Sequence, residues 1–307
     1  MGLVTVLLSL GMEGLFLVST KVMAEFRIGC AVWSYRGWLG NFFPAGSSAQ
    51  DLLRLYGDRL RTVEGNTTFY AVPSEVTVNR WRIQTPKDFR FCLKFPRTVT
   101  HQGLLVPQLS AAQEFMDRVA PLGDRLGCIF AQLPPSYSPA QFDDLKNFFQ
   151  ALTNTGIQLA LEVRHLDWFK EPHSLALATW LESQNITKVL LDTRPIYNCP
   201  DNPQAKSQRK KPNVPLQQIS TSQQAIVRFI SHPNFDYSEP YLSAWVEQIA
   251  QWLSDNKEIY FFVHCPIEDH SPAIAKKFQQ KLEQAQLPVP SLPWQDLPSE
   301  PQQLSLF

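Results

Sequence analysis

The residues of this sequence that are best suited to chemistry stand two positions apart at the ends of apolar runs. Glu162 and Arg164 close the run QLALEVRH, and Asp192 and Arg194 close the run TKVLLDTR. A positioned carboxylate can exchange a proton with a substrate, and an arginine fork matches a phosphate or carboxylate with two parallel hydrogen bonds. Burying such groups is costly unless they are paired or reached by water. These runs therefore predict a polar site and not ordinary core.

Alternation along a strand extends this site to other runs, because residues two apart share a face. The polar side chains expected to face one interior are Glu64, Asn66, Thr68, Lys94, Glu162, Arg164, Asp192, Arg194, Arg228 and His264. The opposite faces are expected to pack against helices through Leu161, Val163, Val189, Leu191, Phe229 and Val263.

The expected interior set holds three carboxylates and four cations, and aromatic residues lie nearby at Trp33, Tyr35, Phe69 and Tyr70. Cations beside aromatic rings favour an anionic ligand that carries a ring, such as a nucleotide, a nucleic-acid end or a phosphosugar. The alternative is an internal ion-pair network that fixes strand register and has no catalytic role.

For proton transfer, the candidate general acids or bases are Glu162, His264 and Asp192. A metal cluster built from Glu162, Asp192 or Asp269 would need the histidines near strand ends, which are His101, His165, His232, His264 and His270. Neither an HxH nor an HExxH spacing is present, so we predict no metal site and no cofactor, and leave a divalent ion open.

The elements that must position these residues alternate between short apolar runs and longer helical patterns. Eight strands are expected at 27–33, 62–69, 89–96, 127–134, 158–165, 187–194, 225–230 and 258–265. Helical patterns separate them, among others at 48–60, 110–122, 138–152, 172–184 and 239–255. Nearly continuous apolar strands indicate a parallel sheet covered on both faces, and eight units in about 250 residues predict a single (β/α)8 TIM-type barrel of the α/β class. A doubly wound sheet is the alternative, but no GxGxxG follows the first strand.

The composition is that of a folded protein with no charge bias. The chain has 307 residues, 44% of them hydrophobic, with 28 basic and 28 acidic residues. Zero net charge argues against a uniformly basic nucleic-acid coat and a polybasic membrane binder. The five cysteines form no CxxC pair, and four lie in apolar runs, so we expect free thiols and a cytoplasmic location.

The chain divides into three parts. Residues 1–24 look like a signal sequence but lack a positive start and are interrupted by Glu13, so we expect an N-terminal extension with an alternative start at Met23. The barrel is expected at 25–286, and a flexible proline-rich tail at 287–307. Within the barrel, the polar segment 195–224 predicts a long loop, either functional or disordered, with Lys206, Arg209, Lys210 and Lys211 near the mouth.

Several of these runs resemble a known family. IGCAVWSYRGW, VEGNTTFY, TPKDFRFCLKFPRTVTH, ALEVRHLDWF, LDTRP and VRFISHP are similar, in consistent order, to the YecE-like family, the bacterial domain of unknown function number 72. The resemblance spans residues 27–286 and implies a TIM-type barrel, but it implies no activity. Gly65 departs from the family pattern, as does HCPIEDHSP after the last strand, which puts a shared role for His264 and Asp269 in doubt.

The last five residues, QLSLF, resemble the pentapeptide by which bacterial DNA polymerases and repair proteins dock on the replication sliding clamp. Gln303 would make the polar anchor, and Leu304, Leu306 and Phe307 would supply the apolar contacts. Such a segment orders only on binding, and the several equivalent pockets of a ring multiply a modest affinity. The alternative is an apolar terminus that packs on its own barrel.

Two hypotheses follow. In the first, the barrel binds, and hydrolyses or otherwise processes, an anionic nucleotide, nucleic-acid or phosphosugar ligand at its mouth, and the tail brings it to DNA. In the second, the protein is a non-catalytic adaptor whose barrel charges are structural.

Overall fold

The computed structural model describes residues 25–205, 207 and 210–294. The expected N-terminal extension, Lys206 and Arg209 of the basic loop, and the QLSLF motif lie outside the described residues.

Eight parallel strands close into one barrel in sequence order, as the strand count predicted. Their bounds are β1 Glu25–Cys30, β2 Thr62–Gly65, β3 Arg90–Lys94, β4 Leu126–Gln132, β5 Leu159–Glu162, β6 Thr187–Asp192, β7 Gln224–Ile230 and β8 Glu258–His264. Strand β1 pairs with both β2 and β8, with Gly29 opposite Thr62 on one side and Phe262 on the other.

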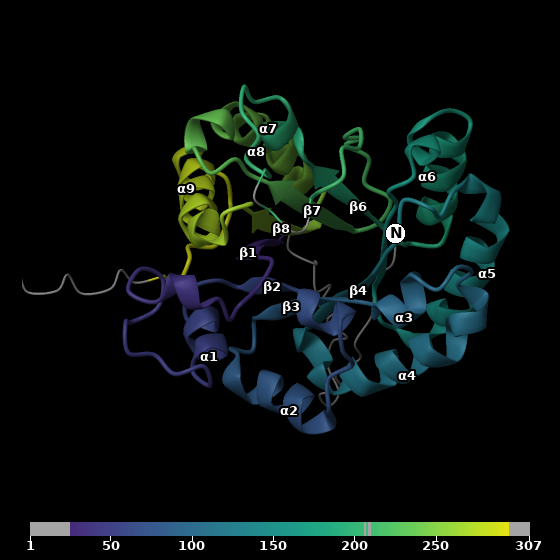
Figure 1. Cartoon of the computed structure of the whole chain (residues 1–307), viewed down its shortest axis with the longest axis horizontal. Helices are drawn as coiled ribbons and strands as arrows, with labels where there is room; N and C mark the ends of the chain where they lie inside the picture. Colours follow the sequence, from purple (N-terminus) through teal and green to yellow (C-terminus); the bar gives the residue numbers. More distant parts are fainter. Residues whose placement is uncertain (1–24, 206, 208–209, 295–307) are drawn as a thin grey trace, which may run out of the picture.

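Helices surround the barrel, and Figure 1 shows them following one another around the strands in chain order. Their bounds are α1 Leu52–Gly57, α2 Glu75–Gln84, α3 Arg97–Thr100, α4 Leu109–Val119, α5 Phe142–Leu152, α6 His173–Ser183, α7 Arg194–Tyr197, α8 Glu239–Ser254 and α9 Ser271–Gln284. Short 3-10 helices lie at Arg36–Trp38, Asn66–Phe69, Val106–Gln108, Ala120–Arg125, Pro139–Gln141, Thr153–Thr155, Leu166–Phe169, Phe235–Tyr237 and Glu268–His270.

Side-chain alternation separates two cores. The barrel interior is filled by Cys92, Cys128, Phe130, Ala160, Val189, Ile226, Tyr260 and Phe262. A larger cluster lies between the sheet and the helices and contains Trp245 of α8 and Phe278 of α9. At Gly29 a Cβ would lie 1.9 Å from the carbonyl oxygen of Thr62, so only glycine allows β1 to approach β2 this closely.

All strands except β7 end earlier than the sequence predicted, and β1 and β2 matter most for the site. Strand β1 ends at Cys30 and β2 at Gly65, and residues Asn66–Phe69 form a 3-10 turn. Side chains hold this turn by bonding to the backbone: Asn66 Nδ2 donates to the Ala31 carbonyl at 2.7 Å, and Thr68 Oγ1 donates to the Gly65 carbonyl at 2.8 Å. These bonds favour a turn over strand continuation. Asn66 therefore stands at the barrel mouth and not within a strand.

The segment that follows α9 packs on the barrel through residue 294. Leu287, Val289, Leu292 and Trp294 contact the outer core, and the Trp294 ring lies edge-on to Phe42 at 4.8 Å. In 287–294 the chain therefore lies against the barrel and does not form the free tether that we expected from residue 287.

Over the described ranges, no helix has both the length and the apolar character to cross a bilayer.

Candidate functional site

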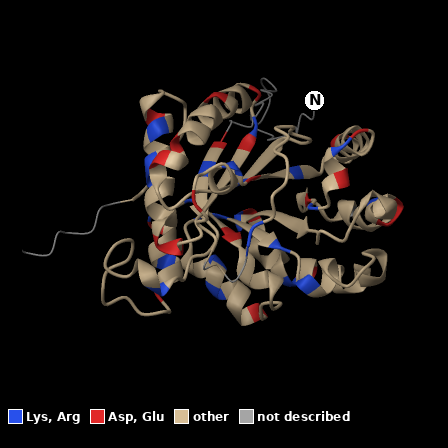
Figure 2. Ribbon diagram, turned by 45° about the horizontal axis from the view of Figure 1, so that its top comes forward, with Lys and Arg blue, Asp and Glu red and all other residues tan. Residues whose placement is uncertain are grey.

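A cavity of about 490 Å³ opens at the carboxyl ends of the strands, where TIM-type barrels hold their active sites. It is lined by Ala31, Val32, Asn66, Phe69, Tyr70, Lys94, Arg97, His101, Gln132, Arg164, Lys210, Lys211, Arg228, His264 and Glu268. Figure 2 shows basic and acidic positions on the central strands as well as on the surrounding helices.

Arg228 links two carboxylates in the floor of this cavity. Its Nε and Nη2 donate to Glu64 at 2.8 and 2.9 Å, and its Nη1 donates to Glu162. Glu64 and Glu162 are 0% and 1% exposed, and Arg228 is 1% exposed. Arg164 Nε donates to the other oxygen of Glu162 at 2.7 Å, so every carboxylate oxygen of this pair is engaged.

Lys94 completes this floor. Its Nζ lies 2.8 Å from Glu64 Oε1 and donates to Gln132 Oε1 at 3.0 Å. Burial lowers the pKa of Lys94 to about 7, with a further decrease from Arg228, against the opposing effect of Glu64. Burial alone would raise the pKa of both glutamates, but Arg228 and the other neighbouring cations lower the pKa of Glu64 well below its usual value and that of Glu162 to about 2. Both carboxylates are thus ionised at neutral pH.

His264 joins the floor to the long loop. Its Nε2 lies 2.7 Å from Glu64 Oε2, and its Nδ1 lies 3.4 Å from Lys211 Nζ. Burial lowers the pKa of His264 to about 3 despite the opposing charge of Glu64, so the ring is neutral near pH 7. An ionised carboxylate can only accept, so the ring proton must lie on Nε2. Nδ1 is then the nitrogen that can take a proton.

Glu268 is the third carboxyl group at the cavity. It belongs to the 3-10 helix Glu268–His270 after β8, and burial raises its pKa to about 8. Its Oε1 is buried and has no hydrogen-bond partner within the described part of the chain. Glu268 can therefore present a protonated carboxyl group to a ligand near neutral pH.

The structure brings together most of the residues that the sequence predicted. Seven of them line the cavity: Asn66, Phe69, Tyr70, Lys94, Arg164, Arg228 and His264. Glu64 and Glu162 lie in its floor, bound to Arg228. The Thr68 hydroxyl is buried and bonds to the carbonyls of Gly65 and Lys94, so it has a structural position.

The prediction that Asp192 and Arg194 point into the barrel is wrong. Asp192 Oδ2 accepts a hydrogen bond from Trp245 Nε1 of α8 at 2.8 Å, and Arg194 pairs with Asp192 and lies over the Tyr241 ring of α8. Val189 of the same strand belongs to the interior cluster. The alternation on β6 is therefore shifted by one residue from our expectation.

Two predicted aromatic residues also lie elsewhere. Trp33 packs edge-on against Trp81 of α2 and against Phe91, at 5.3 and 6.2 Å, in the outer core. The Tyr35 hydroxyl donates to Asp269 Oδ2 at 2.9 Å, and Tyr35 does not line the cavity. Both residues follow β1, where the chain has left the strand geometry on which the prediction depended.

Sequence reasoning missed Arg97, Gln132 and Glu268 as site residues. Gln132 has the same parity on β4 as the interior residue Phe130, so the alternation rule applied to β4 would have found it. Arg97 is the first residue of the short helix α3 after β3, and Glu268 begins the 3-10 helix after β8, so no strand periodicity is available for either. The basic-loop prediction did anticipate Lys210 and Lys211, which both line the cavity.

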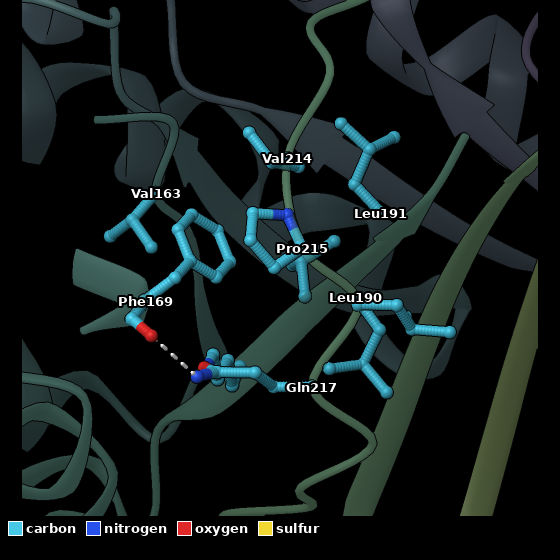
Figure 3. Close-up of a pocket in the computed structure, with 10 residues that line it drawn as sticks. Val163, Phe169, Leu190, Leu191, Val214, Pro215 and Gln217 are labelled. Carbon is cyan, nitrogen blue, oxygen red and sulfur yellow. Dashed lines mark hydrogen bonds between the residues drawn. The ribbon is translucent and has the colours of Figure 1, made fainter. Parts of the chain in front are cut away.

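A second, much smaller cavity lies beside β6. Figure 3 shows Val163, Phe169 and Leu191 around it, together with Val214 and Pro215 of the long loop, and the Gln217 side chain donates to the Phe169 carbonyl at 3.2 Å. Its volume of about 10 Å³ is no larger than a water molecule needs. This contact seals the loop against the sheet and does not form a ligand site.

Comparison with known proteins identifies the family. The profile described as "Protein of unknown function DUF72" matches residues 27–299. The chain belongs to the DUF72 family. It is 32% identical over 283 residues to the UPF0759 protein YecE of Escherichia coli K12 and of E. coli O157:H7, covering 91% of this chain and 99% of each relative.

Solved structures of the DUF72 family share the fold. One from Enterococcus faecalis V583 has a TM-score of 0.63 at 16% identity, covering 86% of this chain and 99% of that one. Another from Thermotoga maritima MSB8 has a TM-score of 0.61 at 22% identity, covering 84% and 98%. At Gly65 a Cβ would lie 2.4 Å from Leu93 Cδ2, so Leu93 occupies the space that a side chain would need.

Proposed function

We propose that the barrel mouth binds an anionic ligand that carries a ring, such as a nucleotide, a nucleic-acid end or a phosphosugar. One observation carries this proposal: the cavity is lined by six cations and a single carboxyl group. The cations are Lys94, Arg97, Arg164, Lys210, Lys211 and Arg228, and the carboxyl group is that of Glu268. Since Glu64 and Glu162 in the floor number fewer than these cations, the mouth keeps a positive surplus.

The outer cations supply the ligand contacts in this proposal. Arg164 bonds to Glu162 through Nε, which leaves its two terminal amino groups for a phosphate or carboxylate. Arg97 and Lys210 are exposed at the cavity wall. Lys94 and Arg228 are paired with the carboxylates of the floor. They therefore attract an anionic ligand through their electrostatic potential more than through direct hydrogen bonds.

Aromatic side chains at one wall support a ligand with a ring. Phe69 lies edge-on to His101, with ring centroids 5.0 Å apart, and Tyr70 is 52% exposed beside it. A base stacked on such rings gains about 1–3 kcal/mol. These aromatic side chains should therefore give a ligand with a ring a higher affinity than a simple inorganic anion.

If the site is catalytic, we assign His264 Nδ1 as a hydrogen-bond acceptor for the substrate, because a pKa of about 3 makes the ring too weak a base to hold a proton near pH 7. The Glu64 carboxylate fixes its orientation and its tautomer. Of the other sequence candidates, Glu162 is held ionised between two arginines, a role that suits orienting Arg164 and Arg228, and Asp192 faces α8. We expect the protein to act in the cytoplasm, in keeping with its five free thiols.

Calorimetric titration tests the binding. The probes are inorganic pyrophosphate, a nucleoside 5′-monophosphate, a short 5′-phosphorylated single strand and a neutral nucleoside. We expect the anions to bind, the nucleoside to fail, and Arg97→Gln with Lys211→Gln to weaken every anion. Tyr70→Ala should weaken the nucleotide and leave pyrophosphate unchanged. Lys146→Gln, on α5, is the matched control. Equal, unmeasurable binding of all probes would reject the proposal.

Turnover separates an enzyme from a binding protein. Phosphoester and glycosidic substrates are incubated with wild type, His264→Gln and Glu162→Gln. Turnover that is lost in His264→Gln, while anion binding remains, supports the catalytic form. If turnover by all three proteins stays at the background level, the catalytic form is rejected and the protein acts by binding alone.

The alternative function is a non-catalytic adaptor that docks on the sliding clamp through its last residues. The complete pairing of Glu64, Glu162 and Arg228 favours structural charges in the floor. Gln303, Leu304, Leu306 and Phe307 lie outside the described residues, so this alternative depends on the sequence motif alone.

A further inference from the structure

Three side chains with metal-ligating atoms meet at the carboxyl end of β7, and none of them lines the cavity described above. They are Cys199 and Asp201, from the turn after α7, and His232, two residues beyond the end of β7. Their ligand atoms all lie within 4.8 Å of one another. His232 Nε2 is 2.9 Å from Asp201 Oδ1, and the Cys199 thiol donates to the Asp201 backbone carbonyl at 3.3 Å.

The histidine of this cluster is rigidly held. Its side chain is 5% exposed, its backbone N–H donates to Ser238 Oγ at 2.8 Å, and its ring lies edge-on to Tyr237 at 4.7 Å. Nδ1 lies 2.9 Å from the Asn234 N–H and 3.2 Å from the Asn234 carbonyl oxygen. Since the Asn234 N–H donates to Nδ1, the ring proton lies on Nε2 and is donated to Asp201. The Asn234 carbonyl is close enough to accept from Nδ1 if the ring changes tautomer.

This orientation suits a metal ligand. Histidines that bind metals commonly donate their second ring N–H to a backbone carbonyl, which aims the free nitrogen at the ion. With Nδ1–H on the Asn234 carbonyl, the Nε2 lone pair of His232 would face Asp201 and Cys199. An ion would replace the proton that now lies between His232 and Asp201.

The donor set selects the class of ion. A thiolate, an imidazole and a carboxylate suit zinc and similar transition metals, whereas magnesium and calcium prefer oxygen ligands alone. The Asp201 side chain is 59% exposed, so the site is open to solvent on one side. We propose that Cys199, Asp201 and His232 bind one zinc-class divalent cation, with water in the fourth position. Binding releases the thiol proton to solvent, and the ring proton moves from Nε2 to Nδ1, so the imidazole stays neutral.

The ion would also fix the loop that reaches the candidate site. The turn with Cys199 and Asp201 continues to Gln204, whose Oε1 accepts from the Lys211 backbone N–H at 2.6 Å. Lys210 and Lys211 line the cavity. A metal that ties this turn to the end of β7 should therefore hold both lysines in place and raise the affinity for anions. This second step rests on the proposed function, whereas the metal site does not.

Cobalt tests the site, because a thiolate ligand gives Co²⁺ a charge-transfer absorption in the near ultraviolet. Full-length protein is treated with chelator and titrated with Co²⁺, and Zn²⁺ is then added in competition. We expect one equivalent to bind, with the band lost in Cys199→Ser and the Zn²⁺ affinity lowered more than about tenfold in His232→Gln. Cys265→Ser and His173→Gln are controls, because neither residue belongs to the cluster.

The outcomes separate the two steps. Absence of the band in wild type, or its retention in Cys199→Ser, overturns the metal site, and equal thermal unfolding of the variants excludes misfolding as the cause of a loss. Nucleoside 5′-monophosphate binding is then measured with and without stoichiometric zinc. If wild type binds zinc but its affinity for the nucleotide is unchanged, the coupling between the metal site and the barrel mouth is rejected. If zinc raises the nucleotide affinity of wild type and not that of Cys199→Ser, the coupling is supported.

Discussion

Arg228 on β7 forms a two-bond pair with Glu64 on β2, with distances of 2.8 and 2.9 Å. Strands β8 and β1 separate these two strands in the barrel, so the pair reaches across the interior. The third bond of Arg228 goes to Glu162 on β5, which also is no neighbour of β7. At the carboxyl end of the barrel, the ion pairs of Arg228 therefore fill the interior and link its opposite sides. Deeper in the barrel, apolar side chains fill the interior.

Removing the central cation should therefore unfold the barrel readily. Arg228→Met leaves two buried carboxylates without their partner, and we expect the free energy of unfolding in urea to fall by about 3–5 kcal/mol. Arg54→Met is the control, because Arg54 also contacts two carboxylates but is 52% exposed, and its loss should change stability by less than about 0.5 kcal/mol. Equal effects of the two substitutions would contradict a cross-linking role for Arg228.

His264 should make stability fall as the pH falls, beginning near the ordinary pKa of histidine. Glu268, whose pKa burial raises to about 8 from 4.5, acts in the opposite sense between these values, so the contribution of His264 is the difference between wild type and its variant. The folded-state pKa of His264 is lowered by burial to about 3 from 6.5, so the unfolded chain takes up this proton first, and stability is lost between these values as pH falls. His101, lowered to about 4 mainly by burial, adds to the same slope. Glu162, lowered to about 2 from 4.5, adds a further loss below pH 4.5.

Urea midpoints at pH 7, 5.5 and 4.5 measure this slope. His264→Gln cannot gain the proton, so its stability should decrease less than that of wild type between pH 7 and 4.5. His173→Gln, whose histidine is exposed, should keep the wild-type slope. A His264→Gln slope as steep as that of wild type would show that another group causes the acid sensitivity.

The alternation rule predicted the barrel and most of its charged floor, because both follow from local pattern. Lys94, Glu162 and Arg228 stand on strands with one clearly polar parity, and all three lie where the rule placed them. Strand β6 has apolar residues on both faces. Which of its residues face the barrel interior therefore depends on the elements that pack against it and not on its own sequence. The partner that decides the position of Asp192 is Trp245, which is 53 residues away.

The parts of the site on loops have no such pattern. Lys211 reaches His264 from a segment that has no described helix or strand between α7 and β7, and its position depends on contacts such as that with Gln204. The turn of Glu268 packs against residues far away in the chain, which buries Oε1 of its carboxyl group. Among these residues is Trp38, whose Nε1 donates to the Glu268 carbonyl at 2.9 Å. Single-sequence reasoning has no signal for such contacts.

Because Asp192 faces α8 and not the cavity, its substitution should lower stability without changing anion affinity. Asp192→Ala leaves the buried indole N–H of Trp245 without an acceptor, so we expect a loss of about 1–3 kcal/mol in the free energy of unfolding. Pyrophosphate affinity should remain unchanged, since Asp192 does not line the cavity. Asp255→Ala, at an exposed position after α8, controls for removal of a carboxylate. An altered pyrophosphate affinity in folded Asp192→Ala would return this residue to the site.

The terminal motif makes a prediction that is independent of the barrel. Deleting residues 303–307 should abolish binding to purified sliding clamp, because Gln303, Leu306 and Phe307 would supply the polar anchor and the apolar contacts. Leu306→Ala with Phe307→Ala should have the same effect, and Ser305→Ala should have little. Surface plasmon resonance against immobilised clamp measures the affinity, and pyrophosphate binding by the deleted chain checks that the barrel is intact. If the full-length chain does not bind clamp even at high micromolar concentration, docking is excluded, and the adaptor alternative loses its partner.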